Sequence, residues 1–210
     1  MSSDSMVLRS AIELMHVPSR ARILRLEALP DGIPFLLLVA AGDAEAESAA
    51  AAITDRPKDL IRKAAGFYIE QILLDAHCDS YRMLGTNPTA TSSELRRNMA
   101  LLLRWLHPDV CPSGERSVLA SKVTLAWDNL KTLERRAAYD ELQRASLAKK
   151  TARHRQGRAS TLKPRSGKLS KSGHRRMGAQ RHGSVPTIYD VENMGFLRRV
   201  WLAIFGGAKL

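Results

Sequence analysis

The stretch TSSELRRNMALLLRWLHPD, residues 91–109, decides the fold. It opens with a hydroxyl-rich turn and a glutamate three residues later, which is the pattern of a helix-capping box. Leu95, Leu102 and Leu106 follow at helical spacing, so an amphipathic helix is expected. Pro108 ends this helix because proline has no backbone N–H to continue the hydrogen-bond ladder.

Three further helices are expected around this one. Residues 80–84 form a short helix that Gly85 stops, residues 115–131 form a longer one, and Thr132 caps a last helix that runs to about residue 143. Their apolar side chains recur at helical spacing, so they should pack together as one core. The predicted core is Tyr81, Leu84, Leu95, Leu102, Leu106, Leu119, Val123, Ala126, Trp127 and Leu130.

The N-terminal part of the chain divides into two expected segments. Residues 1–30 are weakly patterned and predicted to be weakly structured. Residues 31–77 form an N-terminal helical segment in which residues 33–41 are either a buried helix or a strand, because periodicity does not separate the two. Residues 44–53 are rich in Ala and Glu and therefore helical by propensity. Residues 59–76 carry an apolar stripe typical of a helix.

Composition limits the classes of protein that the chain can belong to. It has 210 residues, of which 44% are hydrophobic and only 5% aromatic, which favours a helical core of aliphatic side chains. The longest apolar run, residues 33–41, is too short to span a bilayer. The two cysteines, Cys78 and Cys111, have no metal-ligand spacing, so free thiols in the cytoplasm are expected, with no metal and no cofactor.

The positive charge is concentrated in one segment. The net charge is +12, and residues 149–181 hold twelve Lys and Arg without an acidic residue, so the other 21 basic residues balance the 21 acidic ones. Residues 147–187 are predicted to be a disordered basic linker. Two interpretations stay open: a solvated tether, or contacts to nucleic acid or an anionic surface. The residues available for such contacts are Lys149, Lys150, Arg153, Arg155, Arg175 and Arg176.

The last segment, residues 188–210, is predicted to be an amphipathic helix. Aromatic side chains beside arginines suit a membrane interface, and the same apolar face suits docking on the protein itself or on a partner. Both alternatives stay open at this point. The residues expected to make these contacts are Phe196, Leu197, Trp201 and Phe205.

The tripeptide His107-Pro108-Asp109 has an ordinary explanation when taken alone, since histidine favours a helix C-terminus and proline stops the helix. Its surroundings change that interpretation. With four other motifs in register over about 65 residues, it makes a set of five that resembles the J-domain family of DnaJ-like co-chaperones. The motifs are Tyr81 with Leu84-Gly85, Glu94-Leu95-Arg96-Arg97, His107 thirteen residues after Glu94, Ala126-Trp127 with Leu130, and Glu134-Arg135-Arg136-Ala137-Ala138-Tyr139-Asp140.

The resemblance implies an all-α fold in which residues 78–146 form a J-domain of four helices. Its second and third helices make an antiparallel hairpin with His107, Pro108 and Asp109 at the tip. It also implies a partner, a DnaK-type heat-shock chaperone, which this tip and a basic helix face would bind and whose ATP hydrolysis they would stimulate. Client proteins are further expected partners, and the chain itself is expected not to be an enzyme. The basic face consists of Arg96, Arg97 and Arg104.

Two cysteines leave no zinc domain, so the resemblance is to the minimal class of the family. The chain also departs from the family pattern, because Ala100, Leu101, Trp105 and Val110 stand where basic residues are usual. Leu101 or Trp105 is then expected to contact the N-terminal segment, at its helix of residues 59–76, with an external partner as the alternative. A different function also stays open: a degenerate J-like scaffold that binds nucleic acid or a membrane surface through its basic tail and terminal helix. The expected location is the cytoplasm, with peripheral membrane association as the alternative.

Overall fold

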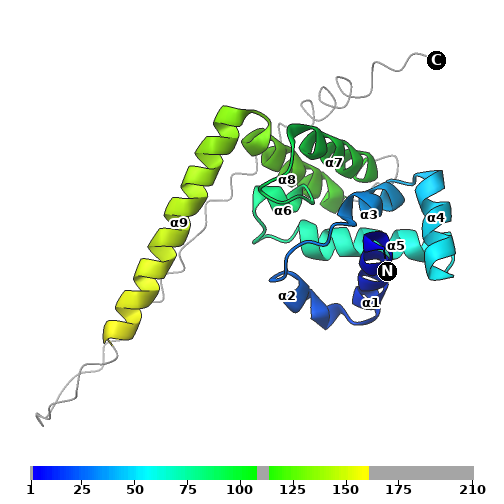
Figure 1. Cartoon of the computed structure of the whole chain (residues 1–210), viewed down its shortest axis with the longest axis horizontal. Coiled ribbons are helices and arrows are strands. Elements are labelled where there is room, and N and C mark those ends of the chain that lie inside the picture. The colour runs from blue at the N-terminus through cyan, green and yellow to red at the C-terminus, as the bar shows by residue number, and fades with distance from the viewer. Residues whose placement is uncertain (1, 108–113, 161–210) are drawn as a thin grey trace, which may run out of the picture. The chain divides into compact units, whose positions relative to one another are not determined.

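The computed structural model describes residues 2–107 and 114–160, with the side chains of residues 116–149 in the second range. The regular structure of these residues is entirely helical, which confirms the all-α prediction. The chain divides into two units, residues 1–140 and 141–210, and each is described by itself. The helices are α1 (Ser3–His16), η1 (Pro18–Arg20), α2 (Ala21–Leu24), α3 (Ile33–Ala40), α4 (Ala44–Thr54), α5 (Lys58–Tyr68), η2 (Ile69–Leu73), α6 (Ser80–Met83), α7 (Ser92–Trp105), α8 (Gly114–Leu130) and α9 (Leu133–Ser160), shown in Figure 1.

The first thirty residues are more ordered than expected. The prediction of a weakly structured N-terminus is wrong for residues 3–16, which form α1 and pack against α5. Ser2 caps this helix, since its side chain accepts a hydrogen bond from the backbone N–H of Ser5. The polar residues that interrupt this stretch, such as Arg9 and Glu13, lie on the exposed side. The buried side is formed by Val7, Leu8, Ala11 and Leu14.

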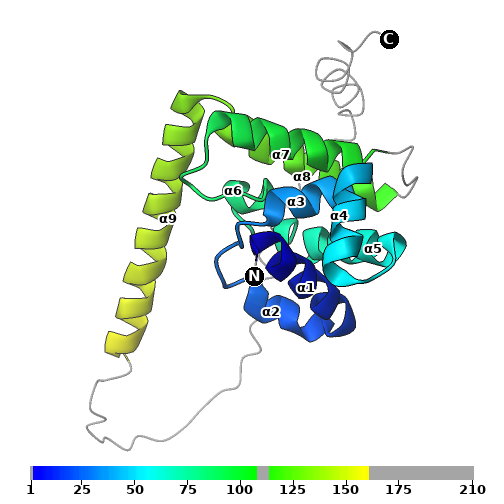
Figure 2. The ribbon, with the colours of Figure 1, turned by 45° about the vertical axis from the view of Figure 1, so that its right-hand side comes forward.

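Residues 33–40 are a helix and not a strand, which settles the alternative left open by the sequence. Helix α3 contacts α1, α4 and α5 on one side and α7 on the other, so it needs apolar side chains around most of its surface. The next helix, α4, begins after Asp43, whose carboxylate accepts from the N–H of Ala46 as the sequence indicated. Figure 2 shows α3 and α4 below α7 and α8.

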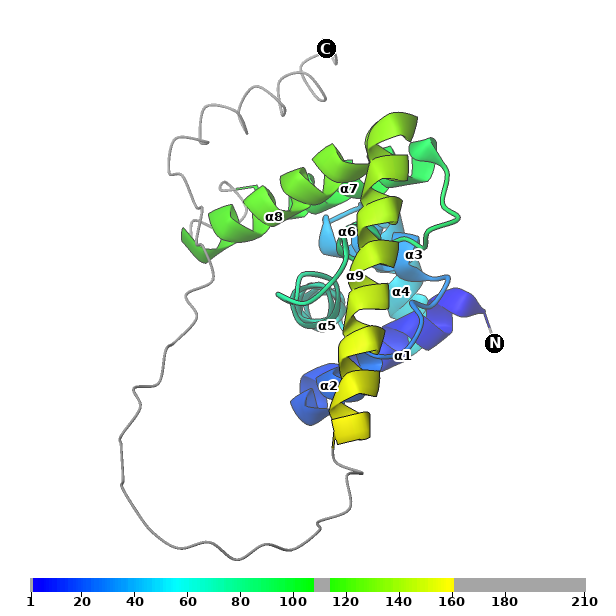
Figure 3. The same ribbon diagram turned by 90° about the vertical axis from the view of Figure 1, so that its left-hand side faces the viewer.

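The helix expected at residues 59–76 changes its winding before it ends. Helix α5 is regular to Tyr68, and the turn that follows, η2, is a π-helix. The N–H of Leu74 donates to the carbonyl of Ile69 at 3.0 Å, a bond over five residues where an α-helix has four. Figure 3 looks along α5 from near one end and shows it beneath α7 and α8.

Helices α7 and α8 form the predicted hairpin. They pack side by side (Figures 1 and 2), and a side chain from the start of α8, Arg116, reaches the carbonyl of Trp105 at the end of α7, so the two helices are antiparallel. The capping box is present, with Thr91 and Glu94 each bonding the other's backbone N–H. The predicted core residues are buried together, with the exception of Leu119 and Trp127, which are half-exposed.

The last helix, α9, is longer than the sequence indicated. Thr132 caps it, accepting from the N–H of Arg135 at 3.3 Å, but the helix continues to Ser160. The prediction of a disordered linker from residue 147 is therefore wrong for residues 147–160. These residues are mainly Ala, Lys, Arg and Gln, which are strong helix formers. The rest of that linker and the C-terminal segment at residues 188–210 lie outside the described residues.

Candidate functional site

The three arginines of the expected basic face lie exposed on α7. Arg97 and Arg104 are seven residues apart, nearly two full helical turns, so they project from the same side. Arg96 lies at the edge of that side. The opposite side of α7 carries the buried residues of the hairpin core, from Leu95 to Leu106. Within the unit, α7 therefore presents these three cations to solvent.

The position of Trp105 shows whether Leu101 or Trp105 contacts the N-terminal helices. The indole is only 5% exposed, and a methyl group built on Gly66 of α5 would lie 3.4 Å from its Cζ2. The expectation that Leu101 or Trp105 contacts the helix at residues 59–76 is thus confirmed for Trp105. Leu101 is half-exposed. The N-terminal helices cover this edge of the hairpin and leave the arginine side open.

Helix α8 adds a side chain that the sequence did not single out. The guanidinium of Arg116 lies 4.8 Å from the centre of the Trp105 ring, and its Nη1 donates to the Trp105 carbonyl at 3.0 Å. Its Nη2 lies 3.9 Å from a carboxylate oxygen of Glu70. No local pattern in the sequence indicates this contact, because it joins three elements that meet only in the folded chain.

Of the tripeptide at the tip, the structure describes His107. It is half-buried directly after the end of α7, and its backbone N–H donates to the carbonyl of Arg104 at 3.3 Å. Pro108 and Asp109 lie outside the described residues, so their roles remain those that the family resemblance implies.

The closing motif at residues 134–140 holds the first turn of α9 against α6. Arg136 donates from Nε to the Tyr81 hydroxyl at 3.0 Å and from Nη1 to the Ala90 carbonyl at 2.8 Å. The Tyr81 hydroxyl in turn donates to Asp140 at 2.8 Å, and the Tyr139 hydroxyl accepts from the backbone N–H of Ser80. Burial and the hydrogen bond to Asp140 raise the pKa of Tyr81, despite the opposing effect of the arginine.

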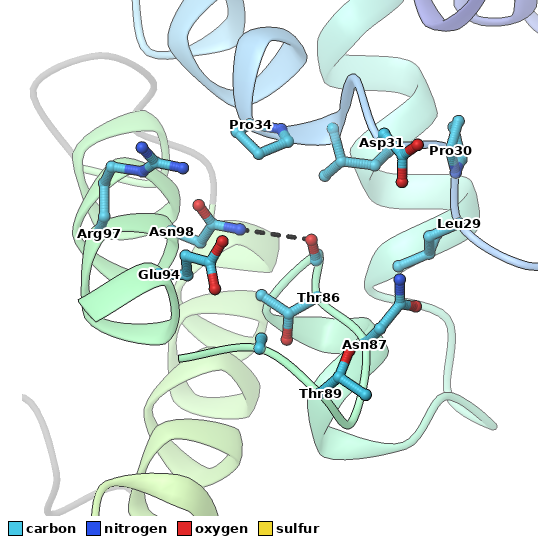
Figure 4. Close-up of a pocket in the computed structure, with 13 residues that line it drawn as sticks. Leu29, Pro30, Asp31, Pro34, Thr86, Asn87, Thr89, Glu94, Arg97 and Asn98 are labelled. Atoms are coloured by element: carbon cyan, nitrogen blue, oxygen red, sulfur yellow. Dashed lines mark hydrogen bonds between the residues drawn. The ribbon is translucent and has the colours of Figure 1, made fainter. Parts of the chain in front are cut away.

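A polar pocket of about 250 Å³ lies beside the arginine face, where the loop before α3 meets the loop between α6 and α7 (Figure 4). Arg97 lines it together with the buried amide of Asn98. The Asn98 nitrogen donates to the carbonyls of Leu84 and Gly85 at 3.0 and 3.3 Å, which fixes the loop ahead of α7. Its Oδ1 accepts no hydrogen bond from the described residues. This asparagine is a positioning residue that the sequence pattern did not reveal.

Few of the residues expected to bind nucleic acid or an anionic surface can be located. Lys149 is exposed on α9. Lys150, Arg153 and Arg155 belong to the same helix, but their side chains lie outside the described residues. Arg175 and Arg176 lie outside the described residues altogether. The same is true of the residues expected to dock on a membrane or a partner, which are Phe196, Leu197, Trp201 and Phe205.

The described residues also bear on membrane-spanning segments and metal sites. None of their helices combines the length and the apolar character needed to cross a membrane. No group of three His, Cys, Asp or Glu side chains among them could hold a metal ion. Cys78 is a free thiol that donates to the Ile72 carbonyl at 3.3 Å, and burial raises its pKa.

Comparison with known proteins finds relatives for part of the chain. It is 40% identical over 62 residues to a chaperone protein DnaJ of Leifsonia xyli, 34% over 64 residues to a curved DNA-binding protein of Coxiella burnetii, and 28% over 75 residues to a chaperone protein DnaJ of Rickettsia prowazekii. These matches cover 30 to 36% of this chain, which spans only about a fifth of the length of each relative. No family model and no solved structure matches the chain.

Proposed function

We propose that residues 78–146 act as a J-domain, because about a third of the chain is similar to DnaJ proteins and α7 and α8 fold as an antiparallel hairpin. In this proposal the chain docks on a DnaK-type chaperone and stimulates its ATP hydrolysis without catalysing a reaction itself. The observation that supports it best is the exposed arginine side of α7, which ends one turn before His107.

The proposed contact surface has two parts with different physical roles. Arg96, Arg97 and Arg104 would attract an acidic patch on the chaperone, which mainly speeds association. His107, Pro108 and Asp109 would make the specific contact, since a carboxylate can pair with an arginine of the partner. The chaperone would then shift between its conformational states, as a partner that prefers one state requires.

Three arginines form a small basic surface, so the attraction should be modest and sensitive to salt. At ordinary ionic strength, exposed charges interact over only about 8–10 Å. We therefore expect half-maximal stimulation to need more of this protein as salt is added. Neutralising Arg97 and Arg104 together should have a similar effect, while Arg62→Gln, at an exposed arginine on α5, should not.

The decisive test is single-turnover ATP hydrolysis by the DnaK-type chaperone of the same organism, with and without the full chain. The wild-type protein should accelerate hydrolysis, and His107→Gln should abolish the acceleration while leaving helical content unchanged. The matched control is His16→Gln, which makes the same replacement at an exposed histidine in the last turn of α1. Stimulation that survives in His107→Gln would refute the assigned role.

The alternative function is a J-like scaffold that binds nucleic acid through its basic segment. The continuation of α9 to Ser160 with exposed Lys149 is the observation in its favour. Such binding would weaken steeply with salt, because counterions released from the phosphates drive it. Duplex DNA titrated with the full chain and with a truncation after residue 146 separates the two proposals, since only the scaffold requires the removed segment.

A further inference from the structure

The contacts among Gly66, Glu70, Trp105 and Arg116 form a continuous chain from the N-terminal helices to both arms of the α7–α8 hairpin. Trp105 is the last residue of α7 and Arg116 the third of α8, so the two flank the connection between these helices. Gly66 and Glu70 are four residues apart on α5 and η2, which places them on the same side. We call this group the brace.

The contacts in the brace join α5 and η2 to the ends of α7 and α8. A β-carbon on Gly66 would lie 3.4 Å from Cζ2 of Trp105, so the indole packs against α5 at this position. Arg116 has a planar guanidinium that stacks on the indole at 4.8 Å and still donates to the Trp105 carbonyl. The same group reaches Glu70 at 3.9 Å, and its side chain is only 20% exposed. Water therefore competes less for Arg116 than for most surface cations.

A second contact supports the same arrangement further along α8. Lys122 donates to the carbonyl of Leu74, just after the π-helical turn, at 3.5 Å. The N-terminal helices thus hold α8 at two places, and hold the end of α7 through Trp105. The relative position of the two helix ends is then set by α5 and η2 as well as by the hairpin core.

We infer that the N-terminal helices act as a positioning element for the proposed chaperone-binding tip, with Glu70, Trp105 and Arg116 as positioning residues. This inference rests on the proposed function. Residues of the brace need not touch the partner. Their effect is to hold the ends of α7 and α8, and with them His107, in one arrangement before binding, so less conformational freedom is lost on docking.

The test compares Arg116→Gln with wild type in the same single-turnover assay, titrating the full chain against the chaperone. We expect the half-saturating concentration to rise roughly three- to tenfold, while the rate at saturation stays the same, because loss of a preorganised state lowers apparent affinity. Arg116→Lys should recover part of the loss, since it keeps the charge but not the planar fork. Glu70→Gln provides a milder change should the arginine variant fail to fold.

The control is Arg62→Gln, which makes the same replacement at an arginine that is 51% exposed and pairs with Glu47 on the N-terminal helices. A shift for Arg116→Gln no larger than that of the control would overturn the inference, and so would a lower rate at saturation with unchanged half-saturation.

A second measurement separates failure of the brace from failure of the proposed function. Amide hydrogen exchange at Leu106 and His107 should quicken in Arg116→Gln and not in Arg62→Gln, whether or not any chaperone is present. If wild type gives no stimulation but exchange responds in this way, the brace stands and the proposed function falls. If wild type stimulates and exchange is unchanged, the brace is refuted alone.

Discussion

Replacing Arg136 by alanine tests how the closing motif holds the unit together. Its guanidinium lies over the Tyr81 ring, 5.2 Å from the centroid. It donates to the Tyr81 hydroxyl and to the carbonyls of Pro88 and Ala90. One side chain at the start of α9 thereby fixes both α6 and the loop that leads into α7. Alanine would leave three oxygen acceptors without this donor.

The size of the loss follows from these contacts. A hydrogen bond from a charged donor contributes about 1.5–3 kcal/mol when it is shielded from water. Arg136 is half-buried, so water replaces part of each bond and the sum must be reduced. We expect Arg136→Ala to lower the free energy of unfolding by about 2–4 kcal/mol. Arg136→Lys should recover less than half, because a single ammonium cannot serve three oxygens in a fixed plane.

Urea denaturation followed by circular dichroism measures this loss, and urea avoids the ionic screening that guanidinium chloride would add. The neighbouring Arg135→Ala is the control, because Arg135 is 55% exposed and its contacts, a hydrogen bond to the Asp128 carbonyl at 3.0 Å and an ion pair with the Asp128 carboxylate at 4.0 Å, lie at the surface. That change should cost no more than about 1 kcal/mol. If the two variants lose the same stability, the network around Arg136 does not hold the unit together and the reasoning fails.

Three further predictions test the core, the loop ahead of α7 and the buried tyrosine. Leu102→Ala should lower the free energy of unfolding by about 2–5 kcal/mol in the same urea experiment, since Leu102 is fully buried between α7 and α8; a loss below about 1 kcal/mol would contradict that packing. Asn98→Ala should cost about 1–3 kcal/mol by leaving two buried carbonyls unpaired, while Asn98→Asp should cost more because it turns a carboxylate toward them; equal losses would argue against the assigned amide orientation. The raised pKa of Tyr81 means that the folded state keeps a proton that the unfolded state loses. The contribution of Tyr81 to stability should therefore be complete below the ordinary pKa of 10.0 and fall as the pH rises beyond it. The fall should be shallower in Tyr81→Phe, and an identical pH profile would show that this hydroxyl is not the cause.

Features coded by a few neighbouring residues could be read from the sequence. The capping box at Thr91 and Glu94 needs only residues within one helical turn, and it is present as predicted. The two helices of the hairpin follow from their amphipathic patterns and the breaks between them, while their antiparallel pairing was implied by the family resemblance. Even the burial of Trp105 could be anticipated, because an aromatic ring outside the hairpin core needs another partner.

Features that depend on tertiary partners could not be read in this way. Helix α1 has polar residues throughout, and its apolar stripe becomes meaningful only when α5 is known to lie against it. The role of Arg116 depends on Trp105 and Glu70 meeting in space, with 46 positions of sequence between Glu70 and Arg116. The extension of α9 to Ser160 shows the opposite case, because it agrees with the local helix propensity of these residues.

In the candidate site, too, some residues are recognised from local spacing and others only from tertiary contacts. The tripeptide and the α7 arginines are recognised from sequence because their spacing is fixed by one helix. Asn98 was overlooked because an asparagine within a helix ordinarily indicates nothing, and its function as a donor to Leu84 and Gly85 depends on how the preceding loop folds back.

The turn at Gly85 has a consequence for how this protein can be divided or recombined. Gly85 has a φ of +63°, and a β-carbon there would lie 2.7 Å from the Cγ2 of Ile33. The turn that ends α6 therefore packs directly against α3. The domain boundary that the sequence suggested after residue 77 separates two segments that share one packed interior. In a fragment that begins at residue 78, the surface that α3 covers would be exposed to solvent. Such a fragment should aggregate or unfold at a lower temperature than the full chain. Transfer of the hairpin to another protein should succeed only if the first 77 residues are transferred with it.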